Sequence, residues 1–496
     1  MKRKNQAAII HASLILAVLL CLSMTSPSYS QEPITVERAL SIASKNSPDI
    51  RKSELNLERS QQSLNAQKAS LKSSFSLTLT PFDYEKTRQF NTFFSTWNTS
   101  ENKQSSGTFT IAQPISWTDG TFAIFNRFGW QDSYSEYQDV RTKSFSNNLY
   151  LNFQQPIFTY NRTRLTLKEL ELDLENTSLS YAMQKLNLER DVTEAFFTVY
   201  QNKMSREIAI DEFHNREQSY NIIKNKVEAG LAAQEELYQA ELDMASSKSN
   251  VQNTQVALDN SLDAFKQLIG LSLFDDITVT ADVSHQTVEI DMQKALDHGL
   301  KHRMELRQRQ IEIENSTFDL IQTSATNEFK GNIDLSYGII GTDEEFEKMY
   351  EVPTRNQRLA LSVDIPLFDW GAKKMRIKAS EAVVKSRELS LEDQKNTIII
   401  GVRQAYRNLN NLVQQIEIAR QNLRNAQLTY DINLERYKNG DLTSMDLNLY
   451  QNQLSEKKKG HVEALINYKI ALLNMKIQSL WDFEQNKAVV PELSEK

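Results

Sequence analysis

The stretch NLYLNFQQPIF, residues 148–158, decides the fold, because in it a strand pattern ends at a proline just before a long helical pattern begins. Leu149, Leu151 and Phe153 alternate with polar side chains, and this period of two predicts a β-strand with one apolar and one wet face. The pattern returns 210 residues later as RLALSVDIPLF, residues 358–368. Strands of about ten residues with this alternation suit the wall of a transmembrane barrel. A half-buried sheet packed on a helical bundle in water is the alternative.

This recurrence belongs to an internal repeat that divides the chain at about residue 285. We expect a first structural repeat over residues 31–284, a second over 285–480, and a C-terminal tail over 481–496. The landmark pairs that support the repeat are Ala39-Leu40 and Ala295-Leu296, Ala195-Phe196 and Ala405-Tyr406, and Gly230 and Gly440.

Long helices account for most of the chain, which contains only 13 Gly and 9 Pro among 496 residues. Two long helix pairs are predicted over 160–270 and 370–478, and the first helix of each would extend about 100 Å at ~1.5 Å per residue. A stripe with alternating spacings of three and four from Leu409 to Tyr430 predicts a coiled coil. The chain is therefore mostly α-helical with a small β part. The predicted helices span 34–73, 160–226, 234–270, 291–328, 370–438 and 443–478.

The predicted strands are too few to close a barrel within one chain, since the smallest membrane barrels use about eight. Because open sheet edges cannot face lipid, several copies must share one barrel. The stretch 85–146 is predicted to be an extracellular loop or an additional β-hairpin, with strands over 108–117 and 121–130, that either caps the barrel or widens it. The other predicted strands span about 75–84, 147–158, 331–341 and 358–368.

The N-terminus predicts export. Three cations at residues 2–4 precede an apolar run and a small-residue site at Ser28-Tyr29-Ser30, which is typical of a signal peptide over residues 1–30. Its removal makes the net charge, −7 for the whole chain, three units more negative, and this acidic balance argues against nucleic acid as a partner. Cys21 is the one cysteine, so the mature chain has no disulfide or thiolate site unless Cys21 is retained as a lipid attachment point.

No catalytic constellation is present in the sequence. The six histidines include no His-Glu-x-x-His zinc motif, and neither a nucleophile motif nor a phosphate-binding motif occurs. We therefore expect no enzyme activity, no catalytic or metal-binding residue and no cofactor.

The chain resembles the TolC-like outer-membrane efflux proteins, the outer membrane factors, from about Pro33 to Leu480. The local motifs are the turn Tyr437-x-x-Gly440-x-x-x-Ser444-x-Asp446-Leu447, the turn Gly230-Leu231-Ala232-Ala233, the run Ala257-Leu258-Asp259-Asn260 leading to Gly270, and the two strand endings quoted above. The resemblance implies a homotrimer that forms a twelve-stranded barrel in the outer membrane and a coiled-coil α-helical tunnel in the periplasm. It also implies a periplasmic adaptor protein and an inner-membrane pump, of the RND, ABC or a similar class, as partners in tripartite efflux or type I secretion.

The resemblance further implies roles for individual residues. The turns Glu228–Gln234 and Asn439–Ser444 would form a periplasmic tip that closes the tunnel and docks on the adaptor. Asp446 and Glu236 would become acidic rings at the entrance, and Tyr437 would help to hold the tip shut. The implied adaptor-docking residues are Gly230, Leu231, Gly440, Asp441, Leu442 and Ser444, and the implied barrel-to-helix junction residues are Pro156, Phe158, Pro366 and Phe368.

Each of these roles has a structural alternative. A glycine that reverses a helix end is common in any helical hairpin, and a carboxylate in the first turn of a helix is favoured by the helix dipole. Leu442 and Leu449 stand where the best-known family member has a latching arginine and a second gate aspartate, so the closing network must differ here. A periplasmic coiled-coil structural protein without a pore and a stand-alone porin are the competing functions, and the sequence does not identify the cargo.

Overall fold

The computed structural model describes residues 33–93, 95–283 and 287–489. It divides into two compact units, one over residues 1–48, 188–287 and 409–472 and the other over 49–187, 288–408 and 473–496. We refer to them as the hairpin unit and the sheet unit, and describe each by itself. The predicted signal peptide and Cys21 lie outside the described residues. No described helix is long and apolar enough to cross a membrane.

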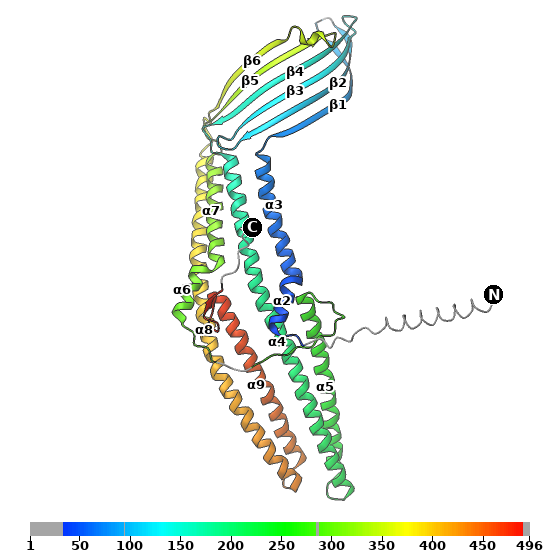
Figure 1. Ribbon diagram of the computed structural model, residues 1–496, viewed down its shortest axis with the longest axis vertical. Helices are drawn as coiled ribbons and strands as arrows, with labels where there is room; N and C mark the ends of the chain where they lie inside the picture. The colour runs from blue at the N-terminus through cyan, green and yellow to red at the C-terminus, as the bar shows by residue number, and fades with distance from the viewer. Residues whose placement is uncertain (1–32, 94, 284–286, 490–496) are drawn as a thin grey trace, which may run out of the picture. The chain divides into compact units, whose positions relative to one another are not determined.

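The sheet unit contains one antiparallel six-stranded sheet in the order β1-β2-β3-β4-β5-β6, so each strand pairs with its neighbours in sequence (Figure 1). Four strands precede the long helix that follows β4, and two lie in the second half of the chain. The strands are β1 (Ser74–Asn91), β2 (Thr96–Ile115), β3 (Gly120–Ser135), β4 (Val140–Ile157), β5 (Lys330–Asp343) and β6 (Thr354–Asp364).

The predicted hairpin within 85–146 is confirmed, because β2 and β3 pair from Ile115 and Gly120 onward. β2 and β3 lie in the sheet between β1 and β4. β1 and β4 are also longer than the predicted strands, and β6 ends at Asp364 rather than at residue 368. β6 ends there because its partner β5 begins at Lys330, which is opposite Asp364.

Helices continue the chain from the sheet. The long helices α4 (Arg162–Glu228) and α8 (Ala372–Asn439) each begin in the sheet unit and end in the hairpin unit, where α5 (Gln234–Ile269) and α9 (Ser444–Ser479) follow them. The shorter helices are α2 (Val36–Asn46), α3 (Pro48–Ser70), α6 (Met292–His302) and α7 (Met304–Ser324), and a 3-10 turn, η1, spans Lys348–Tyr350.

Two helices predicted as continuous are each broken in two. The helix predicted over 34–73 is interrupted at Ser47, whose ψ of 128° is extended, and α3 begins at Pro48. Proline disfavours helical backbone at the preceding residue but suits the first position of a new helix. The helix predicted over 291–328 breaks at Arg303 (ψ 122°). The tail predicted over 481–496 begins with a small ladder of β7 (Trp481–Asp482) and β8 (Lys487–Ala488).

Separate apolar cores hold the two units. In the hairpin unit, Ile223 on α4, Ala240 on α5, Tyr430 on α8 and Leu447 on α9 belong to one buried cluster, so all four helices pack together. In the sheet unit, Leu172 on α4 packs with Ile311 on α7, and α6, α7, α8 and α9 share a second cluster. That second cluster contains Ala295, Leu306, Ile398, Val402 and Met475. Leu409, Leu412 and Ile416 are buried, which confirms the stripe predicted on α8.

Candidate functional site

One face of the sheet is apolar across all six strands. In the register, Leu77 on β1 is opposite Phe109 on β2, and Ile124 on β3 is opposite Leu151 on β4. The band continues through the pair Leu335 and Leu359 on β5 and β6. These side chains are exposed in the single chain, with Leu77 and Leu359 at 62% and 72%. The opposite face carries mainly Ser, Thr, Asn and Gln in the helix-side half of the strands, so the sheet has one face suited to lipid and one suited to water.

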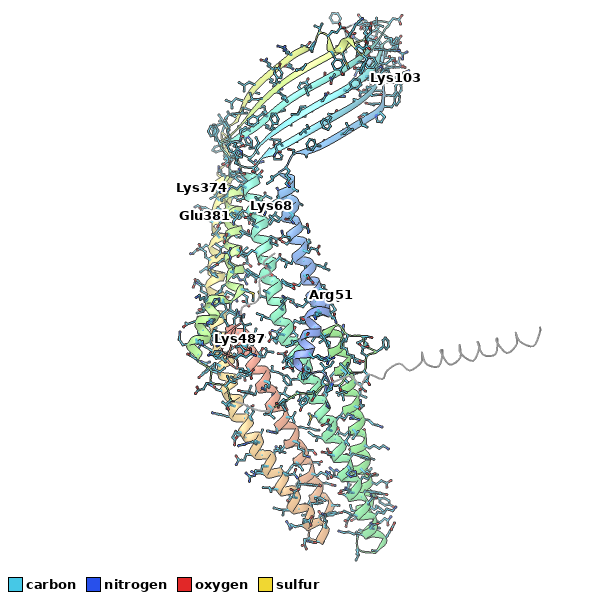
Figure 2. The ribbon with its side chains drawn as sticks, viewed as in Figure 1. Arg51, Lys68, Lys103, Lys374, Glu381 and Lys487 are labelled. Carbon is cyan, nitrogen blue, oxygen red and sulfur yellow. The ribbon has the colours of Figure 1, made fainter. Side chains whose placement is uncertain are left out.

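Aromatic side chains border this band at the end of the sheet where the strands meet the helices. Trp117 in the β2–β3 turn is 82% exposed, and Trp370 beyond β6 is 85% exposed. Of the predicted junction residues, Phe158 packs on Phe329 with ring centroids 5.3 Å apart, and Phe368 packs on Trp370 at 4.7 Å. Exposed aromatic side chains beside an apolar band are typical of the level of lipid headgroups. In Figure 2, Lys374 and Lys68 lie near this end of the sheet and Lys103 lies at the other end.

The backbone at both junctions turns sharply. Phe158 and Trp370 have positive φ angles of 62° and 56°. The Asp369 carboxylate accepts hydrogen bonds from the backbone N–H groups of Gly371 and Lys373 at 3.0 and 2.9 Å, and so caps the start of α8. The sheet end and the helix start are therefore joined by a short, hydrogen-bonded link.

The two predicted tip turns have the same backbone geometry. Gly230 and Gly440 have φ angles of 72° and 89°. Leu231 N–H donates to the Lys226 carbonyl at 2.8 Å, and Asp441 N–H donates to the Arg436 carbonyl at 2.9 Å. These i to i−5 bonds after a left-handed glycine end the two long helices in the same way. Both glycines are therefore left-handed residues at a helix end.

The Asp446 side chain forms a hydrogen bond at the start of α9. Its carboxylate accepts a hydrogen bond from the Thr443 hydroxyl at 2.7 Å, and its backbone N–H donates to the same hydroxyl oxygen at 3.2 Å. This is a capping arrangement in which the residue before the helix and the third helical residue satisfy each other. Asp446 remains exposed, so its charge is also available to solvent.

Tyr437 lies inside the tip. Its side chain is 3% exposed, and its hydroxyl has no hydrogen-bond partner. Burial raises the pKa of Tyr437 to about 12, and the Glu236 carboxylate adds to the rise. The Lys226 ammonium lies 4.7 Å from the centre of the Tyr437 ring. Within one chain, Tyr437 thus approaches Glu236 and Lys226 and does not bond to Asp446.

The predicted docking residues differ in exposure. Leu231 is 78% exposed at the first turn, whereas Leu442 is half-buried against the shared core of the hairpin unit. The exposed apolar residue near the second turn is Met445, also at 78%. Each turn therefore offers one free apolar side chain, although at the second turn it is not the residue that the resemblance implied.

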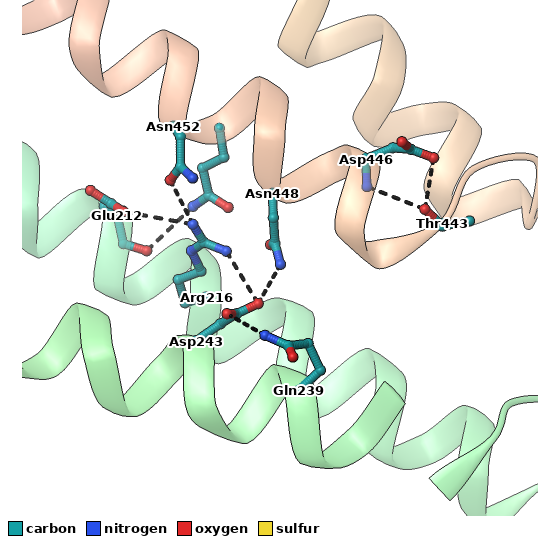
Figure 3. Close-up of polar contacts among 9 residues, drawn as sticks. Glu212, Arg216, Gln239, Asp243, Thr443, Asp446, Asn448 and Asn452 are labelled. Carbon is teal, nitrogen blue, oxygen red and sulfur yellow. Dashed lines mark hydrogen bonds and ion pairs between the residues drawn. The ribbon is translucent and has the colours of Figure 1, made fainter. Parts of the chain in front are cut away.

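Sequence reasoning missed a polar cluster in the hairpin unit (Figure 3). It links the two helical hairpins, α4–α5 and α8–α9. Arg216 on α4 donates to the Asn452 amide oxygen on α9 at 2.7 Å. Its guanidinium lies 3.8 Å from Glu212 and 3.7 Å from Asp243, and its side chain is only 8% exposed. Asn448 on α9 donates to Asp243 on α5 at 2.5 Å. We call these five residues the Arg216 cluster.

The available signal was the position of Arg216 in the stripe of the first hairpin. Phe213, Arg216, Tyr220, Ile223 and Val227 follow one another with spacings of three and four. Arg216 therefore occupies a coiled-coil core position, where a charged residue must find partners.

Comparisons with known proteins agree with this architecture. The family model described as outer membrane efflux protein matches residues 127–271 and 300–476. The solved structure of the CmeC outer membrane channel of Campylobacter jejuni is similar at 12% identity, covering 95% of this chain and 92% of that chain with a TM-score of 0.69. The outer membrane protein VceC of Vibrio cholerae is similar at 14% identity, covering 90% and 96% with a TM-score of 0.65. The open state of the Neisseria gonorrhoeae MtrE channel is similar at 13% identity, covering 89% and 88% with a TM-score of 0.64. The comparison with curated proteins gives no match.

Proposed function

Because the chain belongs to the outer membrane efflux protein family and is an outer-membrane channel, we propose that it is the passive conduit of a tripartite efflux or type I secretion system. The family is one of channels and not of enzymes. The observation that carries the proposal is the apolar band across β1–β6, because it gives the sheet a lipid face and a water face. Solutes or polypeptides would pass along the water face, with the energy supplied by an adaptor and an inner-membrane pump.

The hairpin unit supports assembly into a homotrimer. Although its four helices share a core, large apolar side chains remain uncovered on α5, α8 and α9. Such side chains at helical spacing call for further helices as neighbours. They include Tyr238, Leu242, Val256, Ile418, Leu428, Ile432 and Leu449, each more than half exposed.

The tip would act as the gate and as the docking surface. Leu231 and Met445 would offer apolar contacts to the adaptor, while Gly230, Gly440, Asp441, Leu442 and Ser444 would set the shape of the turns. Asp446 and Glu236 are in the first turns of α9 and α5, and three-fold symmetry would repeat each carboxylate as a ring that favours cations.

We further propose that the Arg216 cluster holds the two hairpins together in the closed state. Arg216 and Asp243 belong to the first hairpin, and Asn448 and Asn452 to the second. Their bonds cross between the hairpins, so the hairpins cannot slide apart without breaking them. The cluster would replace the latch that Leu442 cannot form.

The test is the conductance of the purified protein in a planar bilayer, with divalent cations added on the periplasmic side. We expect a small conductance that divalent cations reduce further, and a weaker block in Asp446→Asn. Glu456→Gln, which removes an exposed charge farther along α9, is the matched control and should leave the block unchanged. If no channel forms and the protein stays soluble without detergent, the conduit proposal fails.

A further inference from the structure

The sheet has two strands more per chain than the twelve-stranded trimer requires. β2 and β3 arise from a segment with no counterpart in the second half, where β5 and β6 form a single hairpin. Their place between β1 and β4 raises the question of whether they belong to the membrane wall or to a separate projection.

The side chains of β2 and β3 bear on this question, because they continue the apolar band of β1 and β4, interrupted by Asn126 between Phe109 and Leu149. Ile111 on β2 is opposite Phe75 on β1 and Ile124 on β3. Phe122 on β3 is opposite Phe153 on β4. A hairpin that projected from the membrane would have no reason to place apolar side chains at the same level and on the same face as its neighbours.

β1–β2 and β3–β4 also end alike. Both end on the sequence Gln-Pro-Ile, at residues 113–115 and 155–157. The Gln113 amide donates to the Leu71 and Pro114 carbonyls at 2.9 and 2.7 Å. The Gln155 amide donates to the Thr118 and Pro156 carbonyls at 2.7 and 2.8 Å. In each case the glutamine ties the strand ending to the link before the neighbouring strand, so the added hairpin repeats the hairpin beside it.

The added turn is built into the helix junction. Asp119 accepts hydrogen bonds from the Thr163 N–H at 3.0 Å and the Thr163 hydroxyl at 2.5 Å. These bonds add to the local cap of α4, where the Arg164 N–H donates to the Asn161 side-chain oxygen at 2.7 Å. In the second half the cap of α8 comes from Asp369, and the residue 210 positions earlier is Thr159. In the first half the added hairpin thus supplies a second capping residue, which fixes the β2–β3 turn at the start of α4.

The two outer edges of the sheet require a partner. β1 and β6 each pair with one neighbour only, and Leu79 and Leu361 on them are 64% and 63% exposed. Unpaired backbone groups cannot face lipid. Because an antiparallel sheet with an even number of strands has edges that run in opposite directions, β6 of one copy can pair with β1 of the next antiparallel.

We propose that three copies close one eighteen-stranded barrel. This inference rests on the trimeric conduit of the proposed function. At a strand spacing of about 4.8 Å and a tilt of about 40°, eighteen strands give a diameter of about 36 Å, against about 24 Å for twelve. The cross-section at the outer membrane is then about twice that of a twelve-stranded barrel. The cargo suited to this conduit is bulky, such as a polypeptide or a large solute.

The experiment is electron microscopy of the full-length protein in lipid nanodiscs, with the mass of the complex measured in parallel. Three chains and eighteen strands are the expected result. A variant lacking residues 90–135, in which Gln89 joins Glu136, keeps β1 as far as Gln89, the 136–139 turn and β4. It should remain a trimer with twelve strands. The size of polymer excluded from the outer mouth should fall in this variant to about two thirds of the wild-type size.

The outcomes separate the two proposals. Three chains with a twelve-stranded wall and a hairpin outside it, or two chains that close twelve strands, would overturn the eighteen-stranded barrel while conductance still supports a conduit. If the wild-type protein forms no conducting channel, the proposed function itself is overturned. Equal polymer exclusion by wild type and variant would also count against the wider barrel.

Discussion

Replacing Arg216 by methionine should loosen the closed tip. Methionine keeps an unbranched chain of similar length, so it retains packing but removes the charge and the bond to Asn452. Breaking a fully buried ion pair by deleting one partner costs about 3 to 5 kcal/mol. Glu212 and Asp243 keep 15% and 25% of their side-chain exposure. Water can therefore solvate the carboxylates left behind, and we expect a smaller cost of about 2 to 3 kcal/mol.

This cost falls on the closed state alone if opening separates the hairpins. A shift of about 2 to 3 kcal/mol changes the ratio of open to closed tips by about 30- to 150-fold. In a planar bilayer, Arg216→Met should therefore raise the open probability without any adaptor. Asn448→Ala, which loses one bond to Asp243, should act in the same direction with a change of about fivefold.

Arg420→Met is the matched control, because Arg420 also lies on a helix of the hairpin unit and pairs with Glu417 at 2.8 Å, yet is 68% exposed. An exposed pair of this kind contributes about 0.2 to 1 kcal/mol, so conductance should match wild type. The reasoning is refuted if Arg216→Met melts at a lower temperature but conducts like Arg420→Met, since the cluster would then hold the fold and not the gate.

Three further predictions test single features of the structure. Asp119→Ala should lower the free energy of unfolding by about 1 kcal/mol through loss of the hydrogen bonds from Thr163 at the start of α4, and a melting curve equal to wild type would contradict that role. Gly440→Ala should destabilise by about 1 to 2 kcal/mol because of its left-handed backbone, whereas Gly460→Ala within α9 should stabilise by about 0.5 to 1 kcal/mol; the two melting temperatures must move in opposite directions. Tyr437 has a folded-state pKa raised to about 12, so its contribution to stability is present below pH ~10 and lost as the pH rises towards ~12. Tyr437→Phe should melt no lower than wild type at pH 7 and should lose less stability over that alkaline window, as thermal denaturation across pH would show.

Much of the fold follows from short-range patterns in the sequence. The alternation at Leu149, Leu151 and Phe153 fixes which side chains share a face, and the positive φ of Gly230 and Gly440 follows from the need to reverse a helix. Strand neighbours are a different matter, because a period of two carries no information about which strand lies beside which. The sequence could therefore indicate that 108–130 forms a hairpin but not that the hairpin lies between β1 and β4 in the sheet.

The Arg216 cluster was missed for a related reason. Arg216 has many acidic and basic neighbours along α4, and a charge in such surroundings is usually solvated. Its burial depends on Asp243 and Asn452, which lie on other helices and reach it only when both hairpins pack. Pairing across helices is a tertiary event, and the one local sign of it is a charge at a core position of the stripe.

Comparison of the two halves of the chain explains why the number of strands can change while the long helices that follow them stay alike. The strand that enters α4 must reach the same edge of the sheet as the strand that enters α8, since each is followed by a helix in the same way. One added strand would reverse the direction of β4 and leave the start of α4 at the wrong edge, whereas an added hairpin restores the direction. The hairpin must also satisfy its own backbone bonds and continue the lipid face, and β2 and β3 meet both conditions through their register with β1 and β4. A pair of strands is thus the smallest insertion that the junction at Pro156 tolerates, and the hydrogen bonds that Asp119 accepts from Thr163 fix the inserted turn at that junction.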